Sequence, residues 1–194
     1  MKPRVVILAA GASSRLGEPK ALARIGPRTA LEHLLLAARV VDARPLVVVG
    51  AHAAEIRAAL ALEPCEFLTN DAWAAGRSSA VVLARSHCPE RDLCISPVDV
   101  PLVRPEVFAS LARAWTERGA PPWGWLAPRH AASGRHGHPI VVGRALAATL
   151  EGSSSLRELR SRARERFDVA VDDDAVLDDL DSAADLARLR SRFA

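Results

Sequence analysis

The fold is decided by the run Val5-Val6-Ile7-Leu8, which is followed at once by Ala9-Ala10-Gly11. Four consecutive apolar residues, three of them β-branched, favour a strand that is covered on both faces. The run Leu46-Val47-Val48-Val49 repeats this pattern further along the chain. Strands of this kind are typical of parallel sheets, because the crossover helices cover both faces of the sheet. The two runs therefore predict a mostly parallel sheet.

Short strands alternate with helical segments along the whole chain. We expect strands at residues 4–8, 45–49, 66–69, 93–96, 124–127, 138–142 and 167–171. We expect helices at residues 29–41, 53–62, 78–86, 105–118, 144–151, 156–164 and 183–192. Capping boxes that pair Thr29 with Glu32 and Ser155 with Glu158 mark two helix starts, the second after a turn that includes Ser153. This alternation predicts one α/β domain over residues 1–194, a three-layer Rossmann-like fold.

The composition is typical of a globular chain with balanced charge. Of 194 residues, 49% are apolar and 25% are charged, and 26 basic residues oppose 23 acidic ones. These values exclude disorder, and no apolar run reaches the roughly 18 residues that span a bilayer. Three cysteines without CxxC spacing form neither a disulfide framework nor a four-cysteine zinc site. We therefore expect a cytoplasmic protein with no membrane anchor and no nucleic acid as partner.

The segment that follows the first strand combines small residues, hydroxyls and cations. Residues 8–20 are Leu-Ala-Ala-Gly-Ala-Ser-Ser-Arg-Leu-Gly-Glu-Pro-Lys. Small residues let backbone amides approach an anion closely, and Arg15 and Lys20 supply positive charge. Neither GxGxxG nor GxxxxGK[ST] is present, which argues against a dinucleotide dehydrogenase and against a P-loop ATPase. The segment predicts a loop that binds a polyphosphate, the alternative being an ordinary turn with surface cations.

Residues 8–20 resemble the LAAGxSxRhGxPK signature of nucleotidyltransferases that activate phosphorylated acceptors with an NTP, and most of all molybdenum cofactor cytidylyltransferases. Four later segments resemble the same family, namely N-x-x-W-x-x-G-x-x-S at residues 70–79, D-x-P-L-V at 99–103, G-H-P at 137–139 and D-I-D-T at 179–182. The chain departs from the family pattern at Val98, where a glycine is usual, and at residues 182–185, which replace T-P-E-D.

The resemblance implies a nucleotide-diphospho-sugar transferase type of fold and an activity. The implied enzyme transfers a nucleoside monophosphate from an NTP to a phosphorylated small acceptor, most of all molybdopterin cofactor, with release of diphosphate. Ala10 favours CTP as the donor, because a glycine at this place accompanies guanylyl transfer in the resembling enzymes. The implied cofactor is Mg²⁺, and the resemblance allows a molybdoenzyme as partner. Other acceptors such as a sugar phosphate, and a non-catalytic nucleotide-binding chaperone for cofactor insertion, remain alternatives.

Three candidate catalytic residues carry charge. Arg15 and Lys20 are expected to stabilise the leaving diphosphate. Asp99 directly follows a predicted strand and is the first expected Mg²⁺ ligand, although an aspartate that merely starts a turn before Pro101 is the alternative. Asp181 is the expected second metal ligand, whereas the rest of its acidic run is expected to face solvent near a helix N-terminus.

The remaining candidates are binding residues. Contacts to the nucleotide are expected from Leu8, Ala9, Ala10, Gly11, Ala12, Ser13, Ser14, Asn70, Gly76 and Ser79. Contacts to the acceptor are expected from Trp73 and His138. A zinc site at His130, His136 and His138 is a weaker alternative, because no cysteine lies nearby in sequence. Trp123 and Trp125 share one face of a strand, where packing in the core is favoured over stacking on a base.

Overall fold

The computed structural model describes residues 1–152 and 154–193, so Ser153 of the predicted turn and Ala194 lie outside the described residues. A seven-stranded sheet has the order β5-β4-β1-β6-β8-β7-β9. Its strands are β1 (Arg4–Ala9), β4 (Leu46–Val49), β5 (Glu66–Thr69), β6 (Leu93–Pro97), β7 (Gly124–His130), β8 (Ile140–Val142) and β9 (Glu165–Val171). Every pair is parallel except those of β8, which runs antiparallel to β6 and β7. The prediction of a mostly parallel sheet is confirmed.

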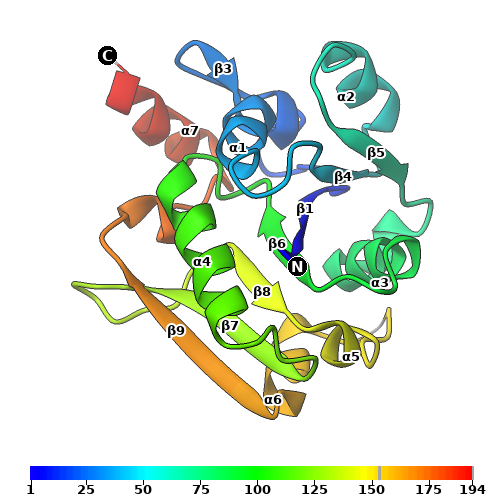
Figure 1. Ribbon diagram of the computed structural model, residues 1–194. Coiled ribbons are helices and arrows are strands. Elements are labelled where there is room, and N and C mark those ends of the chain that lie inside the picture. Colours follow the sequence, from blue (N-terminus) through cyan, green and yellow to red (C-terminus); the bar gives the residue numbers. More distant parts are fainter. Residues whose placement is uncertain (153, 194) are drawn as a thin grey trace.

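Helices cover both faces of this sheet, as Figure 1 shows. The helices that share a core with Val5 and Ile7 of β1 are α1 (Ala30–Ala38), α2 (Ala53–Ala59) and α4 (Pro105–Glu117). The helices that share a core with Val6 and Leu8 are α3 (Arg77–His87), α5 (Arg144–Ala147) and α6 (Leu156–Arg162). Successive strand residues point to opposite faces, so a continuous apolar run serves both cores. The predicted three-layer Rossmann-like α/β fold is therefore confirmed.

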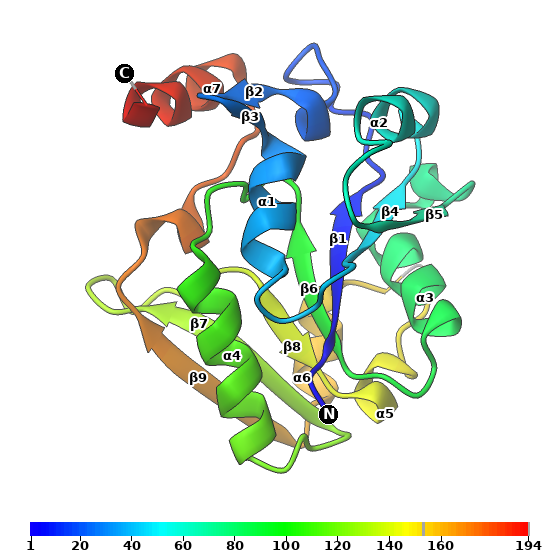
Figure 2. The same cartoon turned by 45° about the horizontal axis from the view of Figure 1, so that its top comes forward.

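A third, smaller apolar cluster joins residues 23–30 to residues 180–189. Strands β2 (Arg24–Ile25) and β3 (Arg28–Thr29) form a hairpin, and helix α7 (Ala183–Arg190) lies beside it (Figure 2). Ile25 of the hairpin packs in this cluster with Leu186 and Leu189 of α7. The cluster lies at the end of the sheet toward which β1 and β6 point. The segment before α7 is thereby brought to the loop that follows β1.

The structure differs from the predicted elements in one hairpin and in the ends of several helices and strands. The hairpin at residues 24–29 was not predicted, because two-residue strands are too short to show a periodic pattern. Helix α1 ends at Ala38 rather than at residue 41. Helix α5 ends at Ala147 rather than at residue 151, because Thr149 and Leu150 form tighter bonds to carbonyls three residues back.

The helix starts follow the local chemistry closely. Both predicted capping boxes are present, and Ser182 with Asp185 forms a third at the start of α7. Short 3₁₀ turns complete the chain at Lys20–Leu22, Trp73–Ala75, Asp174–Leu177 and Ser191–Phe193.

Within residues 1–152 and 154–193, the helices are all too short or too polar for a membrane span.

Candidate active site

A pocket of about 340 Å³ lies at the carboxyl ends of β1 and β6. Ligands of doubly wound α/β sheets bind at this edge. Eleven of the residues expected from the sequence to form the site are in the pocket wall, namely Leu8, Ala9, Ala10, Gly11, Ser13, Ser14, Arg15, Lys20, Trp73, Gly76 and Asp99. The pocket thus brings together the loop after β1, the segment before α3 and the residue after β6.

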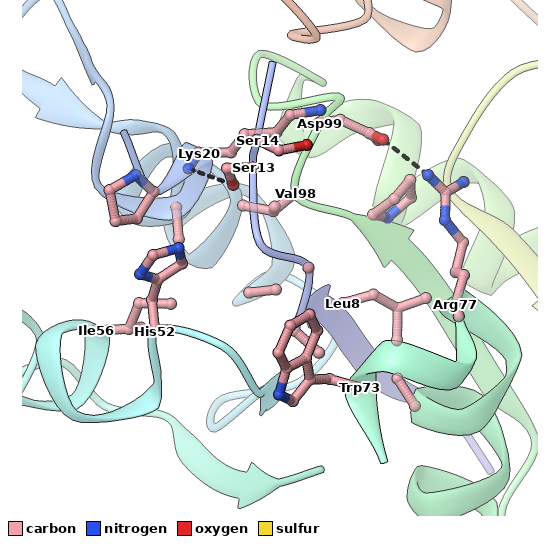
Figure 3. Close-up of a pocket in the computed structure, with 18 of the residues that line it drawn as sticks. Leu8, Ser13, Ser14, Lys20, His52, Ile56, Trp73, Arg77, Val98 and Asp99 are labelled. Carbon is pink, nitrogen blue, oxygen red and sulfur yellow. Dashed lines mark hydrogen bonds and ion pairs between the residues drawn. The ribbon is translucent and has the colours of Figure 1, made fainter. Parts of the chain in front are cut away.

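The loop after β1 is held in shape by its own hydroxyl and by the segment after β4. The backbone N–H of Lys20 donates to Ser13 Oγ at 2.9 Å (Figure 3). Ser13 itself adopts a left-handed conformation, with φ of 54°. His52 Nε2 lies 3.1 Å from the carbonyl oxygen of Ala12. Ala12 is outside the pocket wall, so its carbonyl serves to anchor the loop.

Glycine is required where this second segment passes the loop. A Cβ atom at Gly50 would lie 2.6 Å from the carbonyl oxygen of Ala10 and 2.6 Å from Trp73 Cβ. A real Cβ atom essentially never makes such contacts, so a side chain here would push the loop or Trp73 away. Gly50 therefore sets the spacing between two walls of the pocket.

The two cations of the loop share one carboxylate. Asp181, in the segment before α7, pairs with Lys20 Nζ, and Arg15 Nη2 lies 3.0 Å from its Oδ2. The Lys20 side chain is only 13% exposed, whereas that of Arg15 is 72% exposed. The hydrogen bond from Lys20 lowers the pKa of Asp181, and the positive charge of Arg15 adds to this effect. The structure thus places Asp181 against the phosphate-loop cations, away from the pocket wall.

Asp99 lies in the turn that follows β6, on the other side of the pocket. Its side chain is 16% exposed, and Arg77 Nη2 donates to its Oδ2 at 2.8 Å, as drawn in Figure 3. The backbone N–H of Leu180 donates to the Asp99 carbonyl oxygen at 2.7 Å, which brings the neighbouring Asp179 to the same place. Partial loss of water raises the pKa of Asp179, and the charges of Asp99 and Asp181 raise it further.

Asp179 was not among the predicted site residues. The signal that identifies it is the same D-I-D-T resemblance that pointed to Asp181, because the motif contains both aspartates. His52 and Arg77 were also missed, and both line the pocket. Arg77 stands inside the N-x-x-W-x-x-G-x-x-S resemblance, at a position where the motif specifies no residue type.

Asn70 and Ser79 lie behind the pocket wall. Both residues are buried, and Asn70 Nδ2 donates to Ser79 Oγ at 2.8 Å. Ser79 Oγ in turn donates to the Gly76 carbonyl oxygen at 2.7 Å, and Asn70 Oδ1 accepts from the backbone N–H of Ala72 at 3.2 Å. Gly76 has φ of 107°, a conformation that suits glycine and turns the chain into α3. The pair therefore braces the segment that carries Trp73 and Gly76.

His138 also lies outside the pocket wall, beside the ion pair of Arg77 and Asp99. Burial lowers its pKa to about 4, and the positive charge of Arg77 contributes. Its backbone N–H donates to the Val176 carbonyl oxygen at 3.0 Å. Its Nδ1 atom is buried and has no hydrogen-bond partner among the described residues. His138 is therefore a neutral imidazole close to, but not in, the pocket.

The other histidines and tryptophans have separate partners. His136 Nε2 lies 2.8 Å from Asp168 Oδ1, and His130 Nε2 lies 2.9 Å from Asp174 Oδ1. No group of three or more metal-ligating side chains is found among residues 1–152 and 154–193. Trp125 packs in the core that is shared with α3, α5 and α6, and the ring of Trp123 lies 4.3 Å from the guanidinium of Arg164. Neither tryptophan lines the pocket.

A loop of small residues that carries two cations and faces an aspartate at the sheet edge defines a nucleotidyltransferase of the Rossmann-like α/β class. Residues 5–170 match the family model described as MobA-like NTP transferase domain. The chain therefore belongs to this family of NTP transferase domains.

Known proteins resemble the chain over different lengths. The bifunctional protein GlmU of Xanthobacter autotrophicus (strain ATCC BAA-1158 / Py2) is 37% identical over 125 residues, which are 60% of this chain and 27% of that protein. This match thus covers about a quarter of the curated relative. The crystal structure of Rv0371c from Mycobacterium tuberculosis H37Rv is 28% identical and has a TM-score of 0.79, with 98% of each chain covered. A crystal structure of Rv0371C in complex with manganese is 26% identical, with a TM-score of 0.75 and 98% of each chain covered.

Proposed function

We propose that the protein transfers a nucleoside monophosphate from an NTP to a phosphorylated small acceptor and releases diphosphate. CTP is the favoured donor, and molybdopterin cofactor is the favoured acceptor. The observation that carries the proposal is the meeting of Arg15 and Lys20 with Asp99 in one pocket at the carboxyl edge of the sheet. This arrangement supplies positive charge for a leaving diphosphate and negative charge for a divalent cation.

The charge that develops on the leaving diphosphate determines which residues can assist the reaction. When the bond between the α- and β-phosphates breaks, negative charge grows on the departing diphosphate. Lys20 and Arg15 are the positively charged side chains of the loop that can stabilise this charge, and the backbone amides of residues 10–14 can line the phosphates. A phosphate acceptor is already an anionic nucleophile, so the reaction needs no strong general base. Positioning and charge stabilisation are therefore sufficient for the transfer.

The carboxylates present fit a divalent cation. Asp99 and Asp179 lie close enough for the charge of one to raise the pKa of the other, which is a place where a cation is favoured. Mg²⁺ prefers one or two carboxylates together with substrate phosphates and water. The manganese complex of Rv0371C supports a divalent metal in this family. When bound, the cation would withdraw charge from the phosphates of the donor.

We propose Mg²⁺ as this cation, with Asp99 as its first ligand. Asp181 was the second ligand expected from the sequence, but it already holds Lys20 and Arg15. We propose Asp179 as the second ligand, because the charge of Asp99 reaches it and its carboxylate forms no ion pair with a lysine or an arginine in the part of the chain that the structure describes. Asp181 then acts on the phosphate-loop cations instead.

The preference for CTP is proposed from the wall around Ala10. The Ala10 side chain lies next to Gly50, and a Cβ atom at Gly50 would lie 3.0 Å from it. Trp73 closes the same side of the pocket and is a candidate for contact with the base or with the acceptor. Ala10 is thus a buried residue of the pocket wall, at the position that accompanies the choice between cytosine and guanine in the resembling enzymes.

Diphosphate release tests the proposal. The purified protein would be incubated with each of the four NTPs, Mg²⁺ or Mn²⁺, and a panel of acceptors that includes molybdopterin and sugar 1-phosphates. The variant Asp99→Ala sets the background. Release no faster than this background in every combination would contradict an enzymatic role and favour the cofactor-insertion chaperone.

Substitution of Lys20 gives the most informative variant for this assay. Lys20→Ala should lower turnover by roughly 100- to 1,000-fold, as expected for the loss of one positioned charge. The chain offers a matched control, because Lys2 is its other lysine and reaches the carbonyl oxygen of Val40 at an exposed site. Lys2→Ala should turn over like the wild-type protein. Near-normal turnover of Lys20→Ala would remove Lys20 from the site.

A further inference from the structure

Arg77 occupies an unusual position for a cation. It is the first residue of α3, and the positive end of the helix dipole makes this place unfavourable for positive charge. The first turn of α3 contains no acidic residue, and no side chain caps it among the residues that the structure describes. The compensation comes from Asp99, whose Oδ2 accepts from Arg77 Nη2 at 2.8 Å. Arg77 is therefore stabilised by a residue of the site and not by its own helix.

The same carboxylate is the proposed ligand of the divalent cation. A cation at Asp99 and the guanidinium of Arg77 would repel each other at such short range. The Arg77 side chain is 49% exposed and lines the pocket, so it has room to turn from Asp99 while it stays at the site (Figure 3). Once it leaves Asp99, a guanidinium at a helix N-terminus favours an anion as its new partner.

We propose that Arg77 binds the phosphate of the acceptor and that a divalent cation at Asp99 releases it for this role. The inference rests on the proposed function, because it assigns a residue to the acceptor side of the same reaction. The planar fork of arginine matches a phosphate group through two parallel hydrogen bonds. In-line attack on the α-phosphate comes from the side opposite the leaving diphosphate, and Asp99 with Arg77 lies across the pocket from Lys20 (Figure 3).

Metal binding alone tests the first half of the proposal. Mn²⁺ would be titrated into wild-type protein, Arg77→Ala and Arg77→Gln in the absence of nucleotide, with calorimetric or spin-resonance detection. If Arg77 competes for Asp99, both variants should bind Mn²⁺ up to about fivefold more tightly, the worth of one exposed ion pair. Equal or weaker binding by both variants, with unchanged thermal unfolding, would overturn the competition.

A matched control lies at the other end of the same strand. Arg144 is the first residue of α5, its side chain is 46% exposed, and its Nη1 lies 3.7 Å from Asp92, which directly precedes β6. Arg144→Ala therefore removes a comparable arginine from a comparable pair outside the pocket. Its affinity for Mn²⁺ should equal that of the wild-type protein.

Phosphate binding tests the second half. Inorganic phosphate would be titrated into protein that has been loaded with Mn²⁺ and a non-hydrolysable CTP analogue, so that the donor site is filled. Wild type and Arg144→Ala should bind phosphate, and Arg77→Ala should bind it at least about tenfold more weakly. Equal affinity in Arg77→Ala, or no binding by the wild type, would overturn the assignment. Failure of the wild type to bind the CTP analogue would instead contradict the proposed function.

Discussion

Replacement of Asp181 by asparagine should strengthen the binding of a triphosphate in the absence of metal. Asp181 holds the two cations that the proposed function gives to the phosphates, Lys20 and Arg15. A triphosphate must therefore displace this carboxylate before it gains both cations. Lys20 lowers the pKa of Asp181 from 3.8, so the carboxylate is charged at neutral pH and the variant removes a full negative charge.

The size of the effect follows from the two pairs. The carboxylate of Asp181 is 36% exposed, and we assign each of its two ion pairs the about 0.2 to 1 kcal/mol that is typical of a pair in contact with solvent. In wild-type protein, a triphosphate that displaces Asp181 must break both ion pairs, which costs about 0.4 to 2 kcal/mol. Asp181→Asn removes this cost, and 1.4 kcal/mol corresponds to a tenfold change in affinity. Asp181→Asn should therefore bind the triphosphate about two- to thirtyfold more tightly.

Calorimetric titration with a non-hydrolysable CTP analogue measures this change, first without metal and then with Mn²⁺. Asp178→Asn is the matched control, because Asp178 also pairs with two cations, Arg188 and Arg192, three positions earlier in the chain. The control should bind the analogue like the wild type. An unchanged or lower affinity of Asp181→Asn without metal would refute the displacement. A loss that occurs only with Mn²⁺ would restore Asp181 as a metal ligand.

Three further outcomes are expected. Ala10→Gly should raise kcat/KM for GTP relative to CTP at least about tenfold, since one methyl group separates the two pocket shapes, and competition between the two nucleotides measures it. Asp92→Ala should lower the free energy of unfolding by about 1 to 3 kcal/mol in urea titrations while nucleotide affinity stays unchanged, because Trp115 Nε1, which donates to Asp92 at 3.0 Å, loses its partner far from the pocket. In native protein a thiol reagent at pH 8 should modify the half-buried Cys88 and leave Cys94 intact, because burial raises the pKa of Cys94 to about 12.

The parts of the site that the sequence predicts are local ones. The loop from Leu8 to Lys20 follows directly from a buried strand, so its exit at the sheet edge can be inferred without knowledge of any distant contact. Asp99 is predicted by the same reasoning, because an apolar run ends just before it. Helix starts can also be predicted from local sequence, because a capping box needs only two residues that are three positions apart.

The parts that the sequence does not predict are pairings between distant residues. Lys20 and Asp181 are 161 positions apart, and Arg77 and Asp99 are 22 apart. The periodic spacing of apolar residues and the residue types in turns report only on neighbouring residues, so they do not predict such pairs. The same limit explains Asn70, which the motif placed at the nucleotide and the structure places behind the wall, hydrogen bonded to Ser79. A polar residue next to a binding loop has the same local pattern whether it binds or braces.

The ion pairs of Asp181 and the ion pair of Arg77 are of opposite arrangement, and this has a consequence for the selectivity of the proposed site. On one side the carboxylate of Asp181 occupies cations that phosphates need, and on the other side the guanidinium of Arg77 occupies a carboxylate that a metal ion needs. If the proposed roles hold, a free metal ion would exchange only with Arg77, and a free triphosphate would exchange only with Asp181. The metal complex of a triphosphate exchanges with both at once and leaves the net charge of the pocket nearly balanced. In the proposed site, internal pairing of the charges therefore favours the metal–nucleotide complex over either component alone, because only the complex gives Lys20, Arg15 and Asp99 new partners of opposite charge at once.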